Sequence, residues 1–333
     1  MNMLALTWIG IIAFGVIMYV ILDGFDLGTG ILTLFISDEA DRELMISSIL
    51  PLWDGNETWL VFGGAALYGA FPLAFAKILP LLYVPILVMV IALLFRGVAF
   101  EFRLKAHSSK KLWDGCFFAG SLIATFAQGT ILGAFIQGFD LEHQWGLKQE
   151  IYHWLNPFNL FCGVALIFGY TLLGSNRLIA KTEGELQQKF FNISKKLQFI
   201  IFLSTLIVSI WSPYLDPALF DFWFDPATMY YLAVFPLLSV GLFFLHGYAL
   251  VKRYEHIPFW SLVGIFLMCY FGFIISSYPF LVPRHISYIQ AAAEPSTLLF
   301  MLIGAGVMLP LLLYYTYYAY RIFGGKVTER IGY

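Results

Sequence analysis

The stretch ILPLLYVPILVMVIALLF, residues 78–95, runs for 18 positions without a charged side chain. A helix needs about 20 mostly apolar residues to cross roughly 30 Å of hydrocarbon, and this stretch with its flanks meets that length. The whole chain of 333 residues has the same character, because 60% of it is hydrophobic and 12% is charged. Soluble domains are about one quarter charged, so we expect an all-α integral membrane protein.

Charged residues, glycines and prolines divide the rest of the chain into further apolar stretches of similar length. The pattern predicts a single transmembrane domain, residues 1–333, with about nine spans: 6–35, 50–73, 76–100, 113–138, 155–176, 196–213, 228–250, 257–281 and 295–321. Between the fifth and sixth spans, residues 182–198 are polar. Thr182 followed by Glu185 predicts a connecting helix there, with Thr182 as its N-cap.

The positive charges are distributed unequally between the two sides of the predicted membrane domain. Lys77, Lys148 and Arg284 fall on the side of the N-terminus, and Arg96 lies inside the third span. Because positive loops stay in the cytoplasm, we expect a periplasmic N-terminus and a cytoplasmic C-terminus. The other side carries fifteen Lys and Arg residues: Arg42, Arg103, Lys105, Lys110, Lys111, Arg177, Lys181, Lys189, Lys195, Lys196, Lys252, Arg253, Arg321, Lys326 and Arg330.

Composition excludes several classes of function. The net charge of -2 leaves no basic face for nucleic acid. Cys116, Cys162 and Cys269 are isolated within apolar runs, so we expect small core residues and not a disulfide framework or a metal site. There is no P-loop, no HExxH and no nucleophile elbow, so nothing supports a soluble hydrolase or an ATPase.

The histidines are placed poorly for a haem within this chain. None lies at mid-membrane opposite another, so we expect no bis-His haem here, while Met ligation stays open. Redox centres then belong to another subunit. Five histidines fall in predicted loops or interfaces and one lies near the cytoplasmic end of the seventh span: His107, His143, His153, His256, His285 and His246.

Four carboxylates lie inside the first two predicted spans. Asp23 and Asp26 belong to DGFDLGTG (23–30), and Asp54 and Glu57 belong to WDGNETW (53–59). Each pair is three residues apart and therefore shares a helix face. An ionised carboxylate at this depth costs several kcal/mol unless it is paired or hydrated, and proton relay is the functional hypothesis for such groups. The structural alternative is that they pair with arginines or with backbone amides.

Residues near these carboxylates complete the candidate site. FRGVAFEFRLK (95–105) brings Arg96, Glu101 and Arg103 to the same cytoplasmic side. We expect Arg96 or Arg103 to neutralise one or two carboxylates while the others exchange protons. The alternative is a snorkelling helix end with its own ion pair. Trp53 and Asn56 flank the second carboxylate pair as supporting residues, and simple packing is the alternative for Trp53.

These blocks resemble subunit II of cytochrome bd-type quinol oxidases. The likeness extends from the first span to the last. The exact residues of the blocks and the short loops favour the cyanide-insensitive branch. The matching blocks are DGFDLGTG (23–30), PLWDGNETWLVFGGAALYGAFP (51–72), FRGVAFEFR (95–103), TFAQGTILGAFIQGF (125–139), YPFLVP (278–283) and EPSTL (294–298).

The resemblance implies two four-helix bundles plus a peripheral helix, in the bacterial cytoplasmic (inner) membrane. It implies a haem-carrying subunit I as partner, with two b-type haems and one d-type haem, which oxidises quinol and reduces O2 to water. A small accessory subunit is a further possible partner. Within the implied cytoplasmic proton path, Asp54 is the residue most strongly implicated and Asp23 is a further step. Glu57 is less secure, because an amide occupies its position in some relatives.

Two other functions fit parts of the pattern. A proton-coupled secondary transporter also uses buried carboxylates and interrupted helices, and binding of a transported solute to the lone chain would favour it. A purely structural scaffold would predict that Asp54→Ala leaves turnover unchanged once the complex has assembled.

Overall fold

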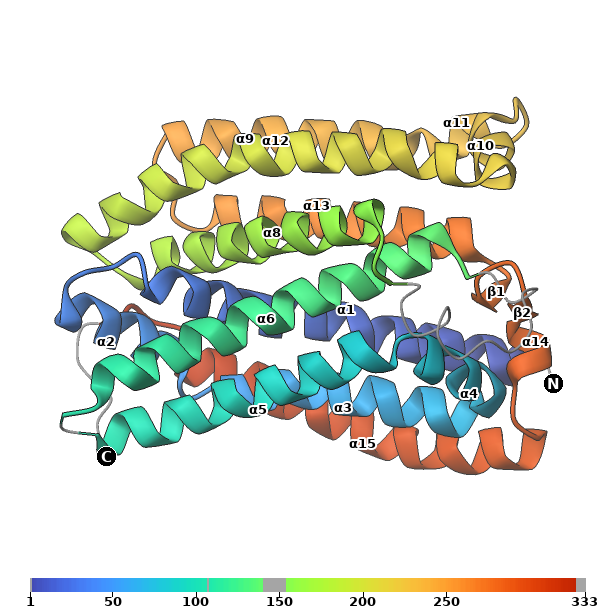
Figure 1. Ribbon diagram of the computed structural model, residues 1–333, viewed down its shortest axis with the longest axis horizontal. Helices are drawn as coiled ribbons and strands as arrows, with labels where there is room; N and C mark the ends of the chain where they lie inside the picture. Colours follow the sequence, from blue (N-terminus) through green and yellow to red (C-terminus); the bar gives the residue numbers. More distant parts are fainter. Residues whose placement is uncertain (1, 107, 140–153, 328–333) are drawn as a thin grey trace.

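A computed structural model of the protein describes residues 2–106, 108–139 and 154–327. Almost all of the regular structure is helical, in long rods that run roughly parallel to one another (Figure 1). The helices are α1 (Asn2–Thr33), α2 (Glu39–Ile49), α3 (Trp53–Ala70), α4 (Pro72–Leu81), α5 (Tyr83–Lys105), α6 (Lys110–Gln137), α8 (Pro157–Lys181), α9 (Gly184–Leu215), α10 (Pro217–Phe224), α11 (Met229–Leu232), α12 (Val234–Val251), α13 (Ile257–Ser277), α14 (Tyr288–Ala291) and α15 (Pro295–Ile322).

The long helices form two bundles and one outlying helix, as the resemblance implied. In the first bundle α1 packs against α3 and α6, and α5 packs against α6. In the second, α8 and α12 each contact α9 and α13. Figure 1 shows α9 and α12 in one layer and α8 and α13 in the next. The outlying helix α15 lies against α3 and α1. Helix α8 joins the bundles through its contacts with α1 and α6.

In the described part of the chain, eight segments are long and apolar enough to cross a membrane. Each of the nine predicted spans coincides with one helix or with two consecutive helices. The span outside the eight is α3, which has 18 residues and begins with the polar run that contains Asp54, Asn56 and Glu57. The prediction of about nine spans is therefore close.

Prolines explain why two predicted spans are each divided into two helices. Span 76–100 is interrupted at Leu82, three residues before Pro85, and span 228–250 at Ala233, three residues before Pro236. A proline ring clashes with the carbonyl group four residues earlier and cannot donate the helical hydrogen bond. The helix is therefore interrupted close to that carbonyl.

The predicted connecting helix at residues 182–198 is wrong in its limits. Helix α9 begins at Gly184 and continues without a break through the sixth span to Leu215. The Thr182 hydroxyl donates to the carbonyl oxygen of Leu178 at 2.7 Å, so it belongs to the end of α8 and not to the start of α9. The N-cap position is occupied by Glu183.

Helices α1 and α8 approach each other closely because both carry glycine at the contact. A Cβ atom on Gly28 would lie 1.7 Å from the carbonyl oxygen of Tyr170, and one on Gly174 would lie 2.6 Å from the carbonyl carbon of Gly28. Only glycine permits this approach, which is a common way for membrane helices to pack.

The two ends of the molecule differ in structure. Helix α1 begins and α15 ends at opposite ends of the long axis (Figure 1). The short helices α10, α11 and α14 lie at the end where α1 begins. The strands β1 (Phe280–Val282) and β2 (Ile286–Ser287) form an antiparallel pair at the same end. Helix α2 lies at the other end.

Candidate functional site

The buried guanidinium of Arg96 is the centre of an ionic network between three helices of the first bundle. Arg96 comes from α5, and its Nη1 lies 2.5 Å from Oδ1 of Asp23 on α1. Its Nη2 lies 2.6 Å from Oε2 of Glu57 on α3. Arg96 and Asp23 are fully buried, whereas the Glu57 side chain is 26% exposed. Arg96 thus neutralises two of the predicted carboxylates, as expected.

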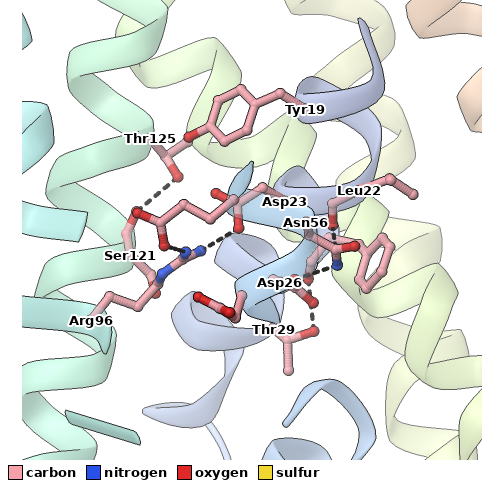
Figure 2. A network of polar contacts seen from close by, with 12 residues as sticks. Tyr19, Leu22, Asp23, Asp26, Thr29, Asn56, Arg96, Ser121 and Thr125 are labelled. Atoms are coloured by element: carbon pink, nitrogen blue, oxygen red, sulfur yellow. Dashed lines mark hydrogen bonds and ion pairs between the residues drawn. The ribbon is translucent and has the colours of Figure 1, made fainter. Parts of the chain in front are cut away.

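Asp26 lies one turn further along α1 and is held by a chain of neutral groups. Its Oδ2 accepts a hydrogen bond of 2.7 Å from Nδ2 of Asn56 (Figure 2). The hydroxyl of Tyr320 on α15 donates to Oδ1 of Asn56 at 2.9 Å. Oδ1 of Asp26 is buried and has no hydrogen-bond partner in the described chain. Asp26 therefore keeps one oxygen available for a proton.

Trp53 covers the ionic network from the start of α3. Its indole stacks on Phe100 with ring centroids 5.1 Å apart, and the Arg96 guanidinium lies 5.8 Å from its centroid. Cation–π attraction of this kind adds to the ion pairs. Trp53 therefore both packs against Phe100 and contacts Arg96.

Asp54 does not join the buried network. It lies in the first turn of α3 with an exposed side chain, on the outer surface of this chain. The next carboxylate along the helix, Glu57, is the partly exposed partner of Arg96. Three of the four predicted carboxylates thus meet, and Asp54 stands outside them.

Arg103 pairs with none of the four predicted carboxylates. It is buried and pairs with Asp114 at the start of α6, which Arg42 also approaches at 3.2 Å. The alternative that Arg103 neutralises one of the four carboxylates is therefore wrong. Glu101 is 63% exposed and its nearest cation is Lys105 at 4.0 Å, so it has no contact with the network.

A small pocket opens beside the Asp26 chain. It lies between the start of α3, with Pro51, Leu52 and Gly55, and the end of α15, with Tyr315 and Thr316. Asn56 and Tyr320 form part of its lining. Two hydrogen bonds, from Tyr320 to Asn56 and from Asn56 to Asp26, thus connect Asp26 to the lining of this pocket.

Sequence reasoning missed three residues of this region. Tyr320 and Asp114 are absent from the predicted site, and Arg177 was counted only among the cations of the cytoplasmic side. An acidic residue directly after Trp113, at the start of a predicted span, is a usable signal for Asp114. Nothing local in the sequence points to Tyr320, because its partner Asn56 is 264 residues away.

The described residues offer no group of three or more His, Cys, Asp or Glu side chains that could hold a metal ion. His246 is fully buried, but its ring nitrogens already face Asn176 at 2.8 Å and Gln198 at 3.1 Å. Its surroundings therefore do not fit a haem iron. His107, His143 and His153 lie outside the described residues. The three cysteines are free thiols.

Two helical bundles, the first of which contains an ion-paired network, define a polytopic helical membrane protein that keeps ionisable groups among its apolar helices. Such groups are a mark of proton-handling membrane proteins. The chain belongs to the cytochrome bd terminal oxidase subunit II family, whose family model matches residues 4–323.

Relatives and a solved structure agree with this membership. The chain is 31% identical over 210 residues to cytochrome bd ubiquinol oxidase subunit 2 of Bacillus subtilis, covering 62% of each chain. It is 30% identical to cytochrome bd-I ubiquinol oxidase subunit 2 of Escherichia coli, over 62% of this chain and 55% of that protein. The match thus spans less than two thirds of these relatives. The bd oxidase structure of Geobacillus thermodenitrificans shares the fold, with a TM-score of 0.79 at 16% identity over 96% of this chain and 98% of that one.

Proposed function

We propose that the chain is the haem-free subunit II of a quinol:oxygen oxidoreductase in the bacterial inner membrane. In this proposal a partner subunit I carries haem b and haem d, oxidises quinol and reduces O2 to water. The chain stabilises that partner and carries protons from the cytoplasm. The observation that carries the proposal is the buried network around Arg96 and Asp26 within a member of this family.

Two groups of residues provide a path of ionisable groups. Asp54 lies at the surface, Glu57 is partly exposed one turn further, and Arg96 links Glu57 to fully buried Asp23. Pairing with a cation favours the ionised form of a carboxylate, so Glu57 and Asp23 keep negative charge along this route, while Asp54 is the group that takes up a proton. Asp26 with Asn56 forms a second approach from the pocket beside α15.

The exposed face of α3 supports the assignment of a partner. Asp54, Thr58, Val61, Ala65 and Tyr68 recur along one face of the helix and are all exposed. An ionisable carboxylate at such a position is costly against lipid. A second protein subunit that covers this face relieves that cost and receives protons from Asp54.

The transporter hypothesis receives less support, because family membership favours an oxidase subunit. Purification of the tagged chain from native membranes in mild detergent tests the choice. We expect haem b and haem d bands in the reduced-minus-oxidised spectrum and a larger protein that co-purifies. A stable, haem-free, solitary chain that binds a transported solute would contradict the oxidase proposal.

Asp54→Asn tests the proton role most directly, since it keeps the shape of the side chain and removes the titratable proton. We expect O2 consumption by the purified complex to fall by on the order of 10²-fold, with haem content retained. Thr58→Val, four residues along the same exposed face, is the matched control and keeps normal turnover. Normal turnover of Asp54→Asn in a fully assembled complex would leave only the scaffold role.

Asp23→Ala tests the inner end of the path. It removes one of the two partners of Arg96, so we expect lower haem content or lower turnover. If both stay at the level of the unchanged protein, Asp23 is a packing residue.

A further inference from the structure

The outer layer of the second bundle, formed by α9 and α12, carries four exposed cations at one end. Lys195 and Lys196 directly precede the uncharged run that continues to the end of α9. Lys252 and Arg253 directly follow α12, which contains no Asp, Glu, Lys or Arg. The two helices contact each other, and their layer lies on the far side of the molecule from α3 (Figure 1). In the proposed complex this layer faces lipid, and its cations lie where apolar helix gives way to charge.

Within the described part of the chain, none of these four cations forms an ion pair, because the carboxylates around them serve other cations. Glu255, two residues after Arg253, lies 2.8 Å from the Lys326 ammonium. Asp41 on α2 lies 2.8 Å from the ammonium of Lys189, near the start of α9. The charge of the four cations is therefore complementary to an anion from outside the chain.

Arg253 adopts a backbone conformation that favours glycine. Its φ is 64°, and the amide of the next residue, Tyr254, donates to the carbonyl oxygen of Ala249 at 3.0 Å. Helices commonly end in this way with a glycine at the left-handed position, and any side chain there strains the backbone. The preference of Lys and Arg for the cytoplasmic side accounts for positive charge in this loop, but not for an arginine at this residue.

The Arg253 side chain is fixed against α9. Its Cζ lies 5.1 Å from the ring centroid of Phe191, and its Nη1 donates to Oε1 of Gln188. Lys195 is one turn after Phe191, on the same face of α9. A guanidinium carries five N–H donors in a fork that matches phosphate, and an ammonium group beside it adds a second charge. Arg253 and Lys195 are thus placed to bind one phosphate group together.

Exposed apolar side chains continue from these cations into the membrane. Phe199 lies one turn beyond Lys195 and is 69% exposed, and Val251 and Phe244 on α12 are 68% and 75% exposed. A phospholipid whose headgroup is bound by Arg253 can lay its acyl chains along these residues. A free phosphate ion would leave them unused, so the surface favours a lipid.

We propose that Arg253 and Lys195 form a binding site for the headgroup phosphate of an anionic phospholipid, between the ends of α9 and α12. Lys252, whose ammonium lies 5.9 Å from the ring centroid of Tyr248, flanks the site. The acyl chains lie on the apolar surface of the two helices. The inference is independent of proton transfer, because lipid binding is measured without turnover.

Native mass spectrometry of the purified complex, after detergent exchange has removed bound lipid, measures the binding. We expect dioleoyl-phosphatidylglycerol to bind more tightly than dioleoyl-phosphatidylcholine, which has the same acyl chains and no net charge. Lys195→Gln should weaken the binding of phosphatidylglycerol about fivefold. Arg253→Gly should weaken it similarly and still assemble, because glycine suits the left-handed backbone.

Lys196→Gln is the matched control, since it removes the same charge at the same depth but about 100° further around the helix. We expect it to have a clearly smaller effect. Equal losses in Lys195→Gln and Lys196→Gln would reduce the site to general surface charge and overturn the proposal. Equal binding of the two lipids, or unchanged binding by Arg253→Gly, would overturn it too. Displacement of the lipid by excess inorganic phosphate would show a site for a free anion and refute the lipid assignment.

Discussion

Arg96 holds two carboxylates of the first bundle, and its removal leaves both without a counter-charge. Breaking a buried ion pair by removing one partner costs about 3–5 kcal/mol. We therefore expect Arg96→Gln to lower the unfolding temperature and the yield of assembled complex sharply. Thermal unfolding of the detergent-purified protein, followed by tryptophan fluorescence, measures the first effect.

Arg321→Gln is the control, because Arg321 is an exposed arginine near the end of α15. It should unfold like the unchanged protein. Equal stability of Arg96→Gln and Arg321→Gln would mean that water or lipid headgroups replace Arg96 in the network.

Most of the candidate residues could be identified from the sequence, whereas the partner that each one contacts could not. Asp23, Asp26, Glu57 and Arg96 stand out because charge inside an apolar run is rare. Which arginine meets which carboxylate depends on helix rotation and depth, and these follow from side-chain packing between helices. That is why the sequence left open whether Arg96 or Arg103 meets these carboxylates, and why the outward direction of Asp54 was not foreseen.

At the scale of elements, the α1–α8 contact is a close approach between the two bundles that depends on glycine. A methyl group at Gly28 collides with the backbone of Tyr170, which a rotamer change cannot relieve. We expect Gly28→Ala to push the helices apart and to destabilise the protein by about 1–3 kcal/mol, measured by thermal unfolding.

Gly10→Ala is the matched control in the same helix, because a Cβ atom there would meet nothing within 4 Å. It should be neutral or slightly stabilising, since alanine favours helix more than glycine does. A Gly28→Ala protein as stable as Gly10→Ala would contradict the tight contact.

The end of the chain after α15 is attached to the second bundle by buried and exposed bonds. The Lys181 ammonium, 1% exposed, donates to the carbonyl oxygens of Phe323 and Gly325, and the amide of Val327 donates to the carbonyl oxygen of Lys181. Lys326 adds an ion pair of 2.8 Å with Glu255. The attachment therefore combines hydrogen bonds from a buried ammonium group with a more exposed ion pair.

Hydrogen bonds from Lys326 and Gln187 hold the pKa of the Glu255 carboxyl below its ordinary value. A lowered folded-state pKa stabilises the attachment above the ordinary carboxyl pKa of about 4.3, and the stabilisation is lost as the pH falls through the lowered value. Because the pair is partly exposed, we expect under about 1 kcal/mol. Hydrogen exchange of the Val327 amide, corrected for its intrinsic rate, should show several-fold less protection in Glu255→Gln at neutral pH.

At acidic pH below the lowered pKa of Glu255, the unchanged protein and Glu255→Gln should exchange alike. Glu185→Gln, an exposed glutamate near the start of α9, serves as control and should follow the unchanged protein throughout. A difference that persists unchanged into acid would show that the glutamine disturbs packing and not charge.

At the scale of the whole molecule, the orientation in the membrane follows from the charge asymmetry between its two ends. We expect Asp225, in the segment between α10 and α11, to face the periplasm and Lys252, after α12, to face the cytoplasm. Asp225→Cys should therefore react with a membrane-impermeant maleimide in intact spheroplasts. Lys252→Cys should react only after lysis.

The unmodified chain, with its three native cysteines, gives the background of this labelling. The reverse pattern at the two positions would invert the predicted topology and move the pocket beside α15 to the periplasmic side.

The architecture of the whole molecule was the most predictable level. A membrane span is a property of length and apolarity along the chain, so each of the nine predicted spans coincides with helix. The breaks before Pro85 and Pro236 were not predicted, because the hydropathy of a segment does not show where its helix is interrupted. The arrangement of the bundles came from the family resemblance and not from periodicity.

The exposed carboxylate on α3 has a consequence for the life of the chain in the cell. A newly made copy without its partner presents Asp54 toward acyl chains, where the charge draws in water or thins the bilayer around it. In the proposed complex the partner subunit covers Asp54, so this cost falls only on unpaired copies. We therefore expect copies made in excess of the partner to be degraded faster than paired copies.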